Sequence, residues 1–219
     1  MSTSLAAGLD AGLDALALDL KPAQRQALLD YLALLQKWNQ VYNLTAVRDP
    51  QAMLSHHLLD CLAVVAPLRE RLASLASPAP IRLLDVGSGA GLPGLVLAIC
   101  LPQLQVDCVD TVAKKSSFIQ QAALSLGLAH LRGLHARVES LGAAYHVVSA
   151  RAFSSLADLV AGSDKALLPG GLWMAMKGKI PDEEIQALPP QVQVLHVEPL
   201  QVPGLDAQRC VVWMRRVSV

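Results

Sequence analysis

A glycine-rich segment between a predicted strand and a predicted helix constrains the fold of this chain more than any other feature. It reads Asp-Val-Gly-Ser-Gly-Ala-Gly over residues 85–91, follows an apolar run, and precedes Pro93, which suits the first turn of a helix. Glycines in such a loop let the backbone approach a ligand closely, and the start of the next helix presents free N–H groups. The segment therefore predicts a ligand-binding turn.

Runs with the pattern of strands alternate with helical stretches after residue 80. These runs lie near residues 81–86, 106–110, 131–136, 145–150 and 172–176. The alternation predicts an α/β fold, with a mostly parallel sheet and helices on both faces. The last two runs, 192–197 and 209–217, leave no room for a helix between them. We therefore expect these two to form a C-terminal antiparallel hairpin at the edge of the sheet.

The first twenty residues carry only a weak helical pattern. Leucines recur at spacings of three to four, but Gly8 and Gly12 each weaken a helix by roughly 1 kcal/mol relative to alanine. We expect residues 1–20 to be weakly ordered, either frayed or helical only where they are docked.

The rest of the segment before residue 80 predicts a helical cap. Pro22 suits the first turn of a strong amphipathic helix, and Asp49 followed by Pro50 predicts a second helix that runs to about Val65. The Ser-Pro-Ala-Pro sequence at 77–80 has the composition of a linker. We thus predict an N-terminal helical cap over residues 1–78 and a ligand-binding domain over 81–219.

Composition excludes several classes of protein. The 219 residues are 53% hydrophobic and 16% charged, which excludes a disordered chain. The longest uncharged apolar run, Leu95 to Leu101, is much shorter than the ~20 residues that cross a bilayer, and no signal peptide is indicated. Four scattered cysteines without a C-x-x-C pair indicate neither a zinc site nor a disulfide framework. We therefore expect a cytoplasmic enzyme without a metal and without a membrane partner.

The acids around the loop favour one cofactor. A dinucleotide-binding loop reads G-x-G-x-x-G, whereas this loop reads G-x-G-x-G with Asp85 two positions before the first glycine. A carboxylate there would repel a pyrophosphate and attract the ammonium group of S-adenosylmethionine. Asp110 ends the next strand, where an acid accepts hydrogen bonds from ribose hydroxyls. We predict S-adenosylmethionine, while an NAD-linked oxidoreductase or a non-catalytic nucleotide-binding module stays open as an alternative.

Several further motifs resemble one known family. They are Trp38 with Asn43-Leu44-Thr45, His57-x-x-Asp60, the loop extended by Leu92-Pro93-Gly94, Asp110 with Lys114, Arg137-Val138-Glu139, Ser149-Ala150-Arg151-Ala152-Phe153 and Lys177-Gly178. Over roughly residues 25–215 the chain resembles the RsmG-type methyltransferases, formerly called glucose-inhibited division protein B. The resemblance implies a class I methyltransferase (Rossmann-like) fold with an N-terminal helical cap. It also implies S-adenosylmethionine-dependent N7-methylation of guanine 527 in bacterial 16S ribosomal RNA.

The resemblance also assigns residues by position. It places cofactor contacts on Gly87, Leu92, Val138, Glu139 and Arg151. With the residues of the loop analysis, the expected cofactor-binding set is Asp85, Gly87, Gly89, Gly91, Leu92, Asp110, Val138, Glu139 and Arg151. The chain departs from the family at His146, where the family usually has Asp, and at His56, where it often has Arg.

Guanine N7 already carries a lone pair, so its methylation needs neither deprotonation nor a covalent adduct. We therefore expect no catalytic nucleophile, and we assign positioning to Arg151. Arg151 could contact the cofactor, orient the guanine O6/N7 edge, or form a structural salt bridge. The candidates for substrate contact are His57, Phe153, Lys177 and Lys179. His57 could instead pin the cap through a hydrogen bond to Asp60, three residues later on one helical face.

Charge is segregated along a chain whose net charge is zero. Residues 111–179 hold eight Lys or Arg against three acids, which could build a basic face or form an ordinary solvated surface. The resemblance implies 16S ribosomal RNA, in the small subunit or its precursor, as the partner of a monomer. The alternative is a class I methyltransferase that acts on a small molecule or a protein, with residues 1–80 as a substrate lid.

Overall fold

The computed structural model describes residues 2–75 and 80–217, so positions 77–79 of the predicted linker lie outside the described residues. A seven-stranded sheet runs through the molecule in the order β3-β2-β1-β4-β5-β7-β6. The strands are β1 (Arg82–Val86), β2 (Gln105–Asp110), β3 (Leu131–His135), β4 (Tyr145–Arg151), β5 (Leu167–Lys177), β6 (Val192–Leu200) and β7 (Arg209–Arg216). Every predicted strand is present, and β5 begins five residues earlier than the sequence indicates.

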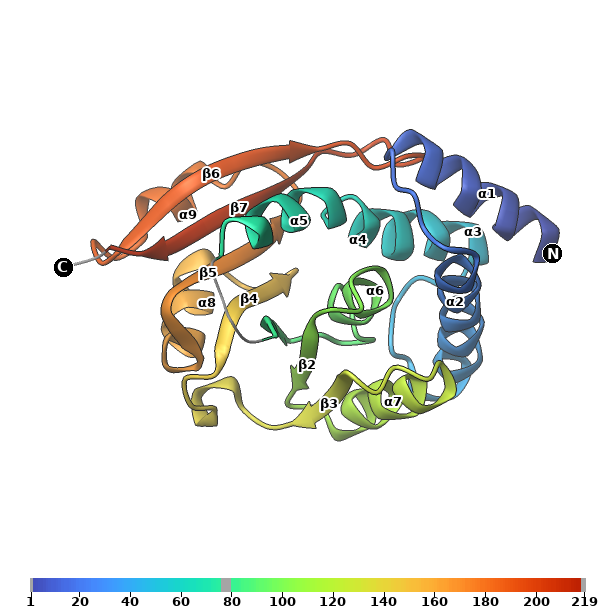
Figure 1. The fold of residues 1–219 in the computed structure, drawn as a ribbon, viewed down its shortest axis with the longest axis horizontal. Coiled ribbons are helices and arrows are strands. Elements are labelled where there is room, and N and C mark those ends of the chain that lie inside the picture. Colours follow the sequence, from blue (N-terminus) through green and yellow to red (C-terminus); the bar gives the residue numbers. More distant parts are fainter. Residues whose placement is uncertain (1, 76–79, 218–219) are drawn as a thin grey trace.

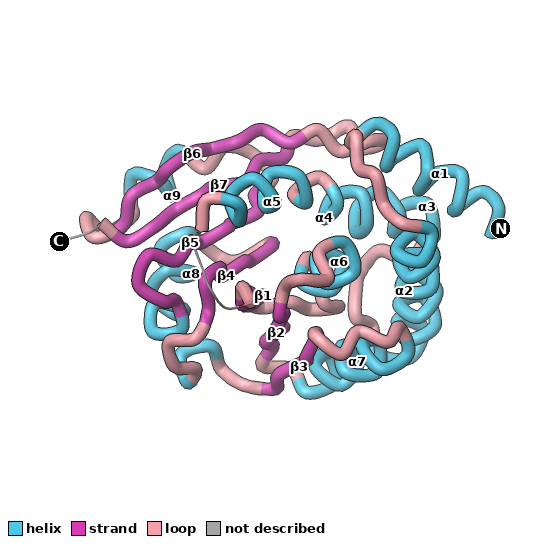
Figure 2. The backbone as a smooth tube through the Cα atoms, viewed as in Figure 1, coloured by secondary structure: helices cyan, strands magenta, loops and turns pink. Residues whose placement is uncertain are grey.

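Strand directions confirm the mostly parallel sheet. β1 pairs in parallel with β2 and β4, and the next strands outward, β3 and β5, are parallel as well. β7 runs antiparallel to both β5 and β6, so the predicted C-terminal hairpin is confirmed. Figure 1 shows this hairpin in orange and red at the upper left, and Figure 2 shows its two strands side by side.

Two hydrophobic clusters cover the two faces of the sheet. Alternate residues of β1 divide between them: Leu83 belongs to one cluster and Leu84 to the other. The first cluster joins the sheet to α6 (Gly94–Cys100), α7 (Ala113–Ser125) and the N-terminal helices, and the second joins it to α8 (Leu156–Ser163). The remaining short elements are η2 (Val138–Ser140), η3 (Asp164–Ala166) and α9 (Asp182–Gln186). The predicted cap thus shares a continuous core with the domain that it covers.

The N-terminal residues form a docked helix, α1 (Ser2–Ala15), which is one of the two expected outcomes. Leu9 and Leu13 are fully buried, and α1 packs on the segment η1 (Leu54–Leu59) and on α2 (Pro22–Tyr42). The glycines that weaken the isolated helix permit this contact. A Cβ at Gly12 would lie 2.4 Å from Leu59 Cδ2, so a larger residue there would hold the two helices apart.

Gly12→Ala is expected to destabilise the protein by up to about 2 kcal/mol, measured by denaturant unfolding. The clash with Leu59 costs about 1–3 kcal/mol, and the better helix propensity of alanine returns roughly 1 kcal/mol. In a Leu59→Ala background the space is open, and the same change should stabilise by roughly 1 kcal/mol. A gain of stability from Gly12→Ala in the wild-type background would contradict the docking of α1.

The second predicted cap helix is interrupted. Asp49 is its N-cap as expected and accepts a hydrogen bond from the Ala52 N–H (2.8 Å). The helix then passes through α3 (Pro50–Met53), the π-helical turn η1 and α4 (Asp60–Leu62), before α5 (Val65–Ala73) begins. A π-helical turn holds more residues than an α-helical turn, so residues three apart do not share a face. This changes the surroundings of His57, which lies within η1.

Candidate active site

A cavity of about 370 Å³ lies at the carboxyl ends of β1, β2 and β4. Ligands of open α/β sheets bind at this edge, next to the point where the strand order reverses. Here β2 and β3 lie on one side of β1, and β4 and β5 lie on the other. The predicted residues that line it are Gly87, Asp110, Val138, Glu139, Arg151 and Phe153. Lys115, Arg137 and Ser154 line it too, although the sequence did not single them out as site residues. The predicted cofactor residues from the ends of β1, β2 and β4 and from the segment after β3 therefore meet in one cavity.

The glycine loop is held in shape by its own backbone and by α2. Gly87, Gly89 and Gly91 have φ values of 64°, 58° and 85°, a region that L-residues rarely adopt. The Gly89 N–H donates to Asp110 Oδ2 (3.0 Å), and the Tyr31 hydroxyl of α2 donates to the Ala90 carbonyl (2.9 Å). Gly89, Gly91 and Leu92 do not line the cavity. Contact of these three residues with the cofactor stays a prediction.

Asp85 lies elsewhere than the sequence analysis expects. Its side chain is fully buried beneath the loop, where Oδ2 accepts from the Gly94 N–H (3.0 Å) and Oδ1 accepts from the Ser149 hydroxyl (2.9 Å). Burial raises its pKa to about 7, although both hydrogen bonds oppose the shift. The carboxyl group does not line the cavity, and its hydrogen bonds tie β1 to α6 and β4. Its contact with an ammonium group stays a prediction.

Asp110 occupies the place expected for a ribose-binding acid. Its oxygens accept from the N–H groups of Gly89 and Val112 at 3.0 and 2.9 Å, and Lys115 Nζ lies 3.5 Å from Oδ2. These contacts fix the carboxylate at the cavity wall, with lone pairs left for hydroxyl donors. Val138, which is buried, and Glu139 form the next wall. An acid for the ribose and an apolar wall for the adenine fit S-adenosylmethionine.

Arg151 links this cavity to a second cavity of about 400 Å³. Its Nη1 donates to Asp60 Oδ2 (3.0 Å) and to the His56 carbonyl (2.9 Å). Asp60 Oδ1 also accepts from Arg209 Nε (2.9 Å). The salt bridge considered for Arg151 is therefore present, and Arg151 lines both cavities as well. Arg209 was missed, although a cation directly before the apolar run 210–214 was a signal that could have identified it.

His57 does not bond to Asp60, so that prediction is wrong. Its Nε2 lies 2.8 Å from the Thr45 hydroxyl oxygen, because the π-helical turn directs it away from Asp60. Burial, with a further contribution from the charge of Arg151, lowers its pKa to about 4, so the ring is neutral at pH 7. His57 nevertheless lines the second cavity together with Asp60 and Arg151.

The two lysines after the fifth strand have different surroundings. Lys177 is the last residue of β5 and is largely buried, and its Nζ contacts both carboxylate oxygens of Glu184 at 3.1 and 2.8 Å and the Phe153 carbonyl at 3.3 Å. Lys179 is exposed. Lys179 therefore presents a solvated ammonium group, whereas the Lys177 ammonium is paired with Glu184. Substrate contact by either lysine stays a prediction.

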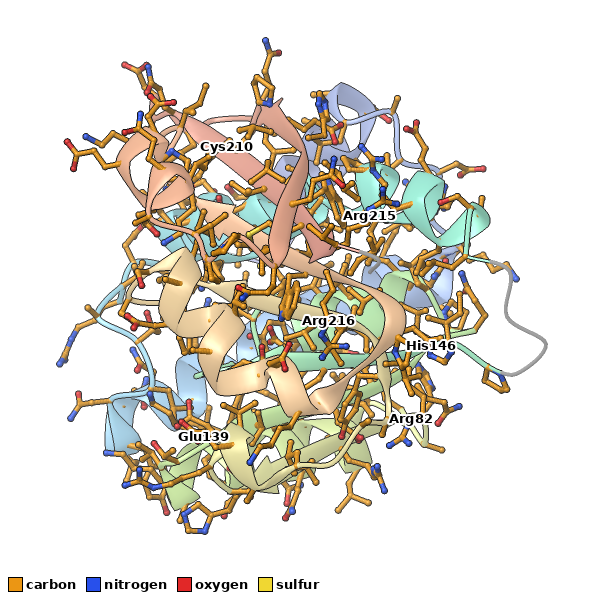
Figure 3. All side chains as sticks on the ribbon, turned by 90° about the vertical axis from the view of Figure 1, so that its left-hand side faces the viewer. Arg82, Glu139, His146, Cys210, Arg215 and Arg216 are labelled. Atoms are coloured by element: carbon orange, nitrogen blue, oxygen red, sulfur yellow. The ribbon has the colours of Figure 1, made fainter. Side chains whose placement is uncertain are left out.

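The basic segment 111–179 does not gather on one face. Arg132 lies near the amino-terminal end of β3, where its guanidinium donates to both oxygens of Asp107 at 2.7 Å. His146 also lies at this end, and its Nδ1 accepts from the Arg82 N–H (3.1 Å). Figure 3 shows Arg82 and His146 together on the right, away from Glu139 and Cys210 on the left. His146, which stands where the family usually has Asp, therefore lies away from the cofactor cavity.

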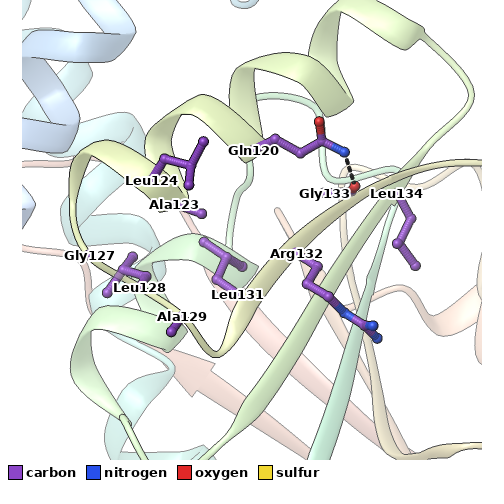
Figure 4. A pocket seen from close by; sticks show the side chains of 10 residues that line it. All are labelled: Gln120, Ala123, Leu124, Gly127, Leu128, Ala129, Leu131, Arg132, Gly133 and Leu134. Atoms are coloured by element: carbon purple, nitrogen blue, oxygen red, sulfur yellow. Dashed lines mark hydrogen bonds between the residues drawn. The ribbon is translucent and has the colours of Figure 1, made fainter.

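A wider cavity of about 570 Å³ lies between α7 and β3 and contains no predicted site residue. Figure 4 shows its mainly apolar lining and the Gln120 amide, which donates to the Gly133 carbonyl (2.9 Å) at the sheet edge. Within residues 2–75 and 80–217, no group of three metal-binding side chains is present, and no helix is long and apolar enough to cross a membrane.

Comparison with known proteins identifies one family. A family model described as rRNA small subunit methyltransferase G matches residues 24–212. Proteins named ribosomal RNA small subunit methyltransferase G are 62% identical in Paracidovorax citrulli, over 97% of this chain and 90% of that protein, and 61% identical in Acidovorax ebreus, over 99% and 98%.

Solved structures share the fold at low sequence identity. TrmN from Thermus thermophilus has a TM-score of 0.55 and 22% identity, over 75% of this chain and 53% of that one. The N-methyltransferase NodS from Bradyrhizobium japonicum, in complex with S-adenosyl-L-homocysteine, has a TM-score of 0.57 and 12% identity, over 84% and 100%. The chain therefore belongs to the rRNA small subunit methyltransferase G family and is an S-adenosylmethionine-dependent methyltransferase of the class I fold.

Proposed function

We propose that this protein methylates N7 of one guanine, guanine 527 by family resemblance, in bacterial 16S ribosomal RNA. The observation that carries the proposal is the pair of adjoining cavities that share Arg151 and Ala152. One has the acid and the apolar wall that suit a nucleoside cofactor, and the other has room for a base next to it. The names of the relatives support a ribosomal RNA substrate.

The chain's own residues bind and orient in this proposal. S-adenosylmethionine supplies, when bound, a methyl group activated by a sulfonium. Asp110 would hold the ribose hydroxyls, Val138 and Glu139 the adenine, and Arg151 would border both ligands. Guanine N7 keeps its lone pair at neutral pH, so alignment of that atom carries most of the rate enhancement.

The thiols support a mechanism without a covalent intermediate. All four cysteines are buried, and burial raises the pKa of Cys61, Cys100, Cys108 and Cys210. A thiol with a raised pKa is a poor nucleophile at neutral pH because little thiolate is present. Cys210 alone borders the second cavity, and it faces the Lys179 carbonyl at 3.5 Å.

The decisive experiment supplies the purified protein with small-subunit particles from a strain that lacks the corresponding gene. Mass spectrometry of the digested 16S RNA should show one new 7-methylguanine, at the position of guanine 527. Methylation of added small molecules or of ribosomal proteins instead of RNA would favour the alternative substrate class. A cytoplasmic, monomeric enzyme is part of the proposal, since ribosomal particles are cytoplasmic and one chain carries both cavities.

Lys179→Ala is expected to weaken binding to the particle and to flatten its salt dependence. Each phosphate contact contributes roughly 0.7 to the slope of log affinity against log salt for single strands. Lys177→Ala should leave that slope unchanged, because Glu184 already neutralises Lys177. Binding measured between low and high salt checks both variants. An unchanged slope for Lys179→Ala would remove this residue from the RNA-facing surface.

A further inference from the structure

The second cavity is built around a buried carboxylate between two guanidinium groups. Asp60 is 3% exposed, and its two oxygens accept separately from Arg151 Nη1 (3.0 Å) and Arg209 Nε (2.9 Å). The three residues come from α4, β4 and β7, so sequence neighbours do not create this arrangement. Asp60 holds one nitrogen of each arginine, and Arg209 Nη1 also donates to the Gln208 carbonyl (2.7 Å), so two bonds orient the Arg209 guanidinium.

The cavity carries an excess of hydrogen-bond donors. Arg151 and Arg209 bring two positive charges against the single negative charge of Asp60, and Lys177 at the rim is neutralised by Glu184. His57 also lines the cavity and is 6% exposed, and its Nδ1 has no hydrogen-bond partner among the described residues. Because guanidinium groups donate and never accept, this cavity suits a ligand that presents acceptors.

The apolar part of the lining indicates a flat ligand. Val47, Met176 and Leu200 line the same space as the arginines. A phosphate alone would leave these side chains without a contact, whereas a purine base offers an apolar face and a polar edge. The cavity also meets the cofactor cavity at Arg151 and Ala152, so an atom bound here lies beside the place where a methyl group would be delivered.

We propose that this cavity binds the target guanine, that Arg209 selects it by donating to O6, and that Asp60 is the positioning residue for Arg209. Guanine presents O6 and N7 as adjacent acceptors, whereas adenine presents an amino donor in place of O6. The inference rests on the proposed function, since it names the base and the edge that the site reads.

The test compares particles that carry guanine or 2-aminopurine at the target position. 2-Aminopurine keeps N7 and the exocyclic N2 but lacks O6. For the wild type, we compare kcat/KM on the guanine particle with kcat/KM on the 2-aminopurine particle. The O6 contact should contribute a factor of about 5–150 to this ratio, which corresponds to ~1–3 kcal/mol per good base contact. Arg209→Gln should reduce this ratio by that factor, and Asp60→Asn should reduce it in the same direction.

Arg215→Gln is the matched control. Arg215 lies on the same strand and is exposed, and its guanidinium donates to the Gln193 amide oxygen at 3.4 and 3.3 Å. The Arg215→Gln variant should leave the ratio of kcat/KM for the two particles unchanged. Calorimetric titration with S-adenosylmethionine should give the wild-type dissociation constant for Arg209→Gln, and circular dichroism should report the native fold.

A wild-type ratio in Arg209→Gln, with the fold intact, would overturn the inference. Discrimination can also be read without turnover, from the affinities of the two particles in the absence of cofactor. If the wild-type enzyme fails to methylate the guanine particle at N7, the proposed function itself fails. If it methylates that particle and Arg209→Gln retains full discrimination, only the assignment of Arg209 and Asp60 fails.

Discussion

Asp85→Asn is expected to gain stability over the wild type as the pH rises from 4 to 8. The pKa of Asp85 is raised from 3.8 to about 7 in the folded protein, so the native state holds a proton that the unfolded chain has already lost. The stability due to this group is fully present below pH 3.8 and is lost as the pH rises to 7. Three pKa units correspond to about 4 kcal/mol.

Asparagine can keep the hydrogen bonds at this site. Its carbonyl can accept from the Gly94 N–H, its amide can donate to the Ser149 hydroxyl oxygen, and Ser149 can donate to the Leu84 carbonyl at 3.5 Å. Urea unfolding of both proteins across this pH range gives the difference directly, because every other titrating group is common to them. A difference that stays constant with pH would show that Asp85 is ionised in the native state, against the burial argument.

The same residue shows which parts of the site the sequence could have predicted. Side chains alternate across a strand, so Asp85 shares the face of Leu83, which packs under α6. The Asp85 carboxyl group therefore points toward α6 and away from the side of the loop that faces a ligand. The charge of Asp85 alone favours a contact with a ligand, whereas its position along β1 decides the direction of the carboxyl group.

The sheet was predictable because its signals are local. Strand patterns, the glycine loop and the missing helix before residue 209 each depend on a few neighbouring residues. The second cavity depends instead on contacts across the fold: Asp60 and Arg209 are 149 residues apart, and the Lys177–Glu184 pair closes over an intervening loop. The π-helical turn that separates His57 from Asp60 leaves no pattern in the sequence that distinguishes it from an α-helix.

Gly94, at the start of α6, has no space for a side chain. An ideal Cβ at Gly94 would lie 2.5 Å from Cys108 Sγ and 2.9 Å from Asp85 Cβ. These atoms belong to β2 and β1, two paired central strands, so neither can move without disturbing the sheet. The close approach of α6 to both strands is what allows the Gly94 N–H to reach the buried carboxyl group.

Gly94→Ala is therefore expected to destabilise the protein by about 2–6 kcal/mol in denaturant unfolding. Overpacking costs about 1–3 kcal/mol, and a broken hydrogen bond to Asp85 adds about 1–3 kcal/mol. Gly142→Ala, where a Cβ meets nothing within 4 Å, should change stability by less than about 0.5 kcal/mol. Adding Cys108→Ala to Gly94→Ala should recover part of the loss, because the shortest contact is with Sγ. If the losses of stability from Gly94→Ala and Cys108→Ala simply add in the double variant, α6 and β2 are not in contact at this point.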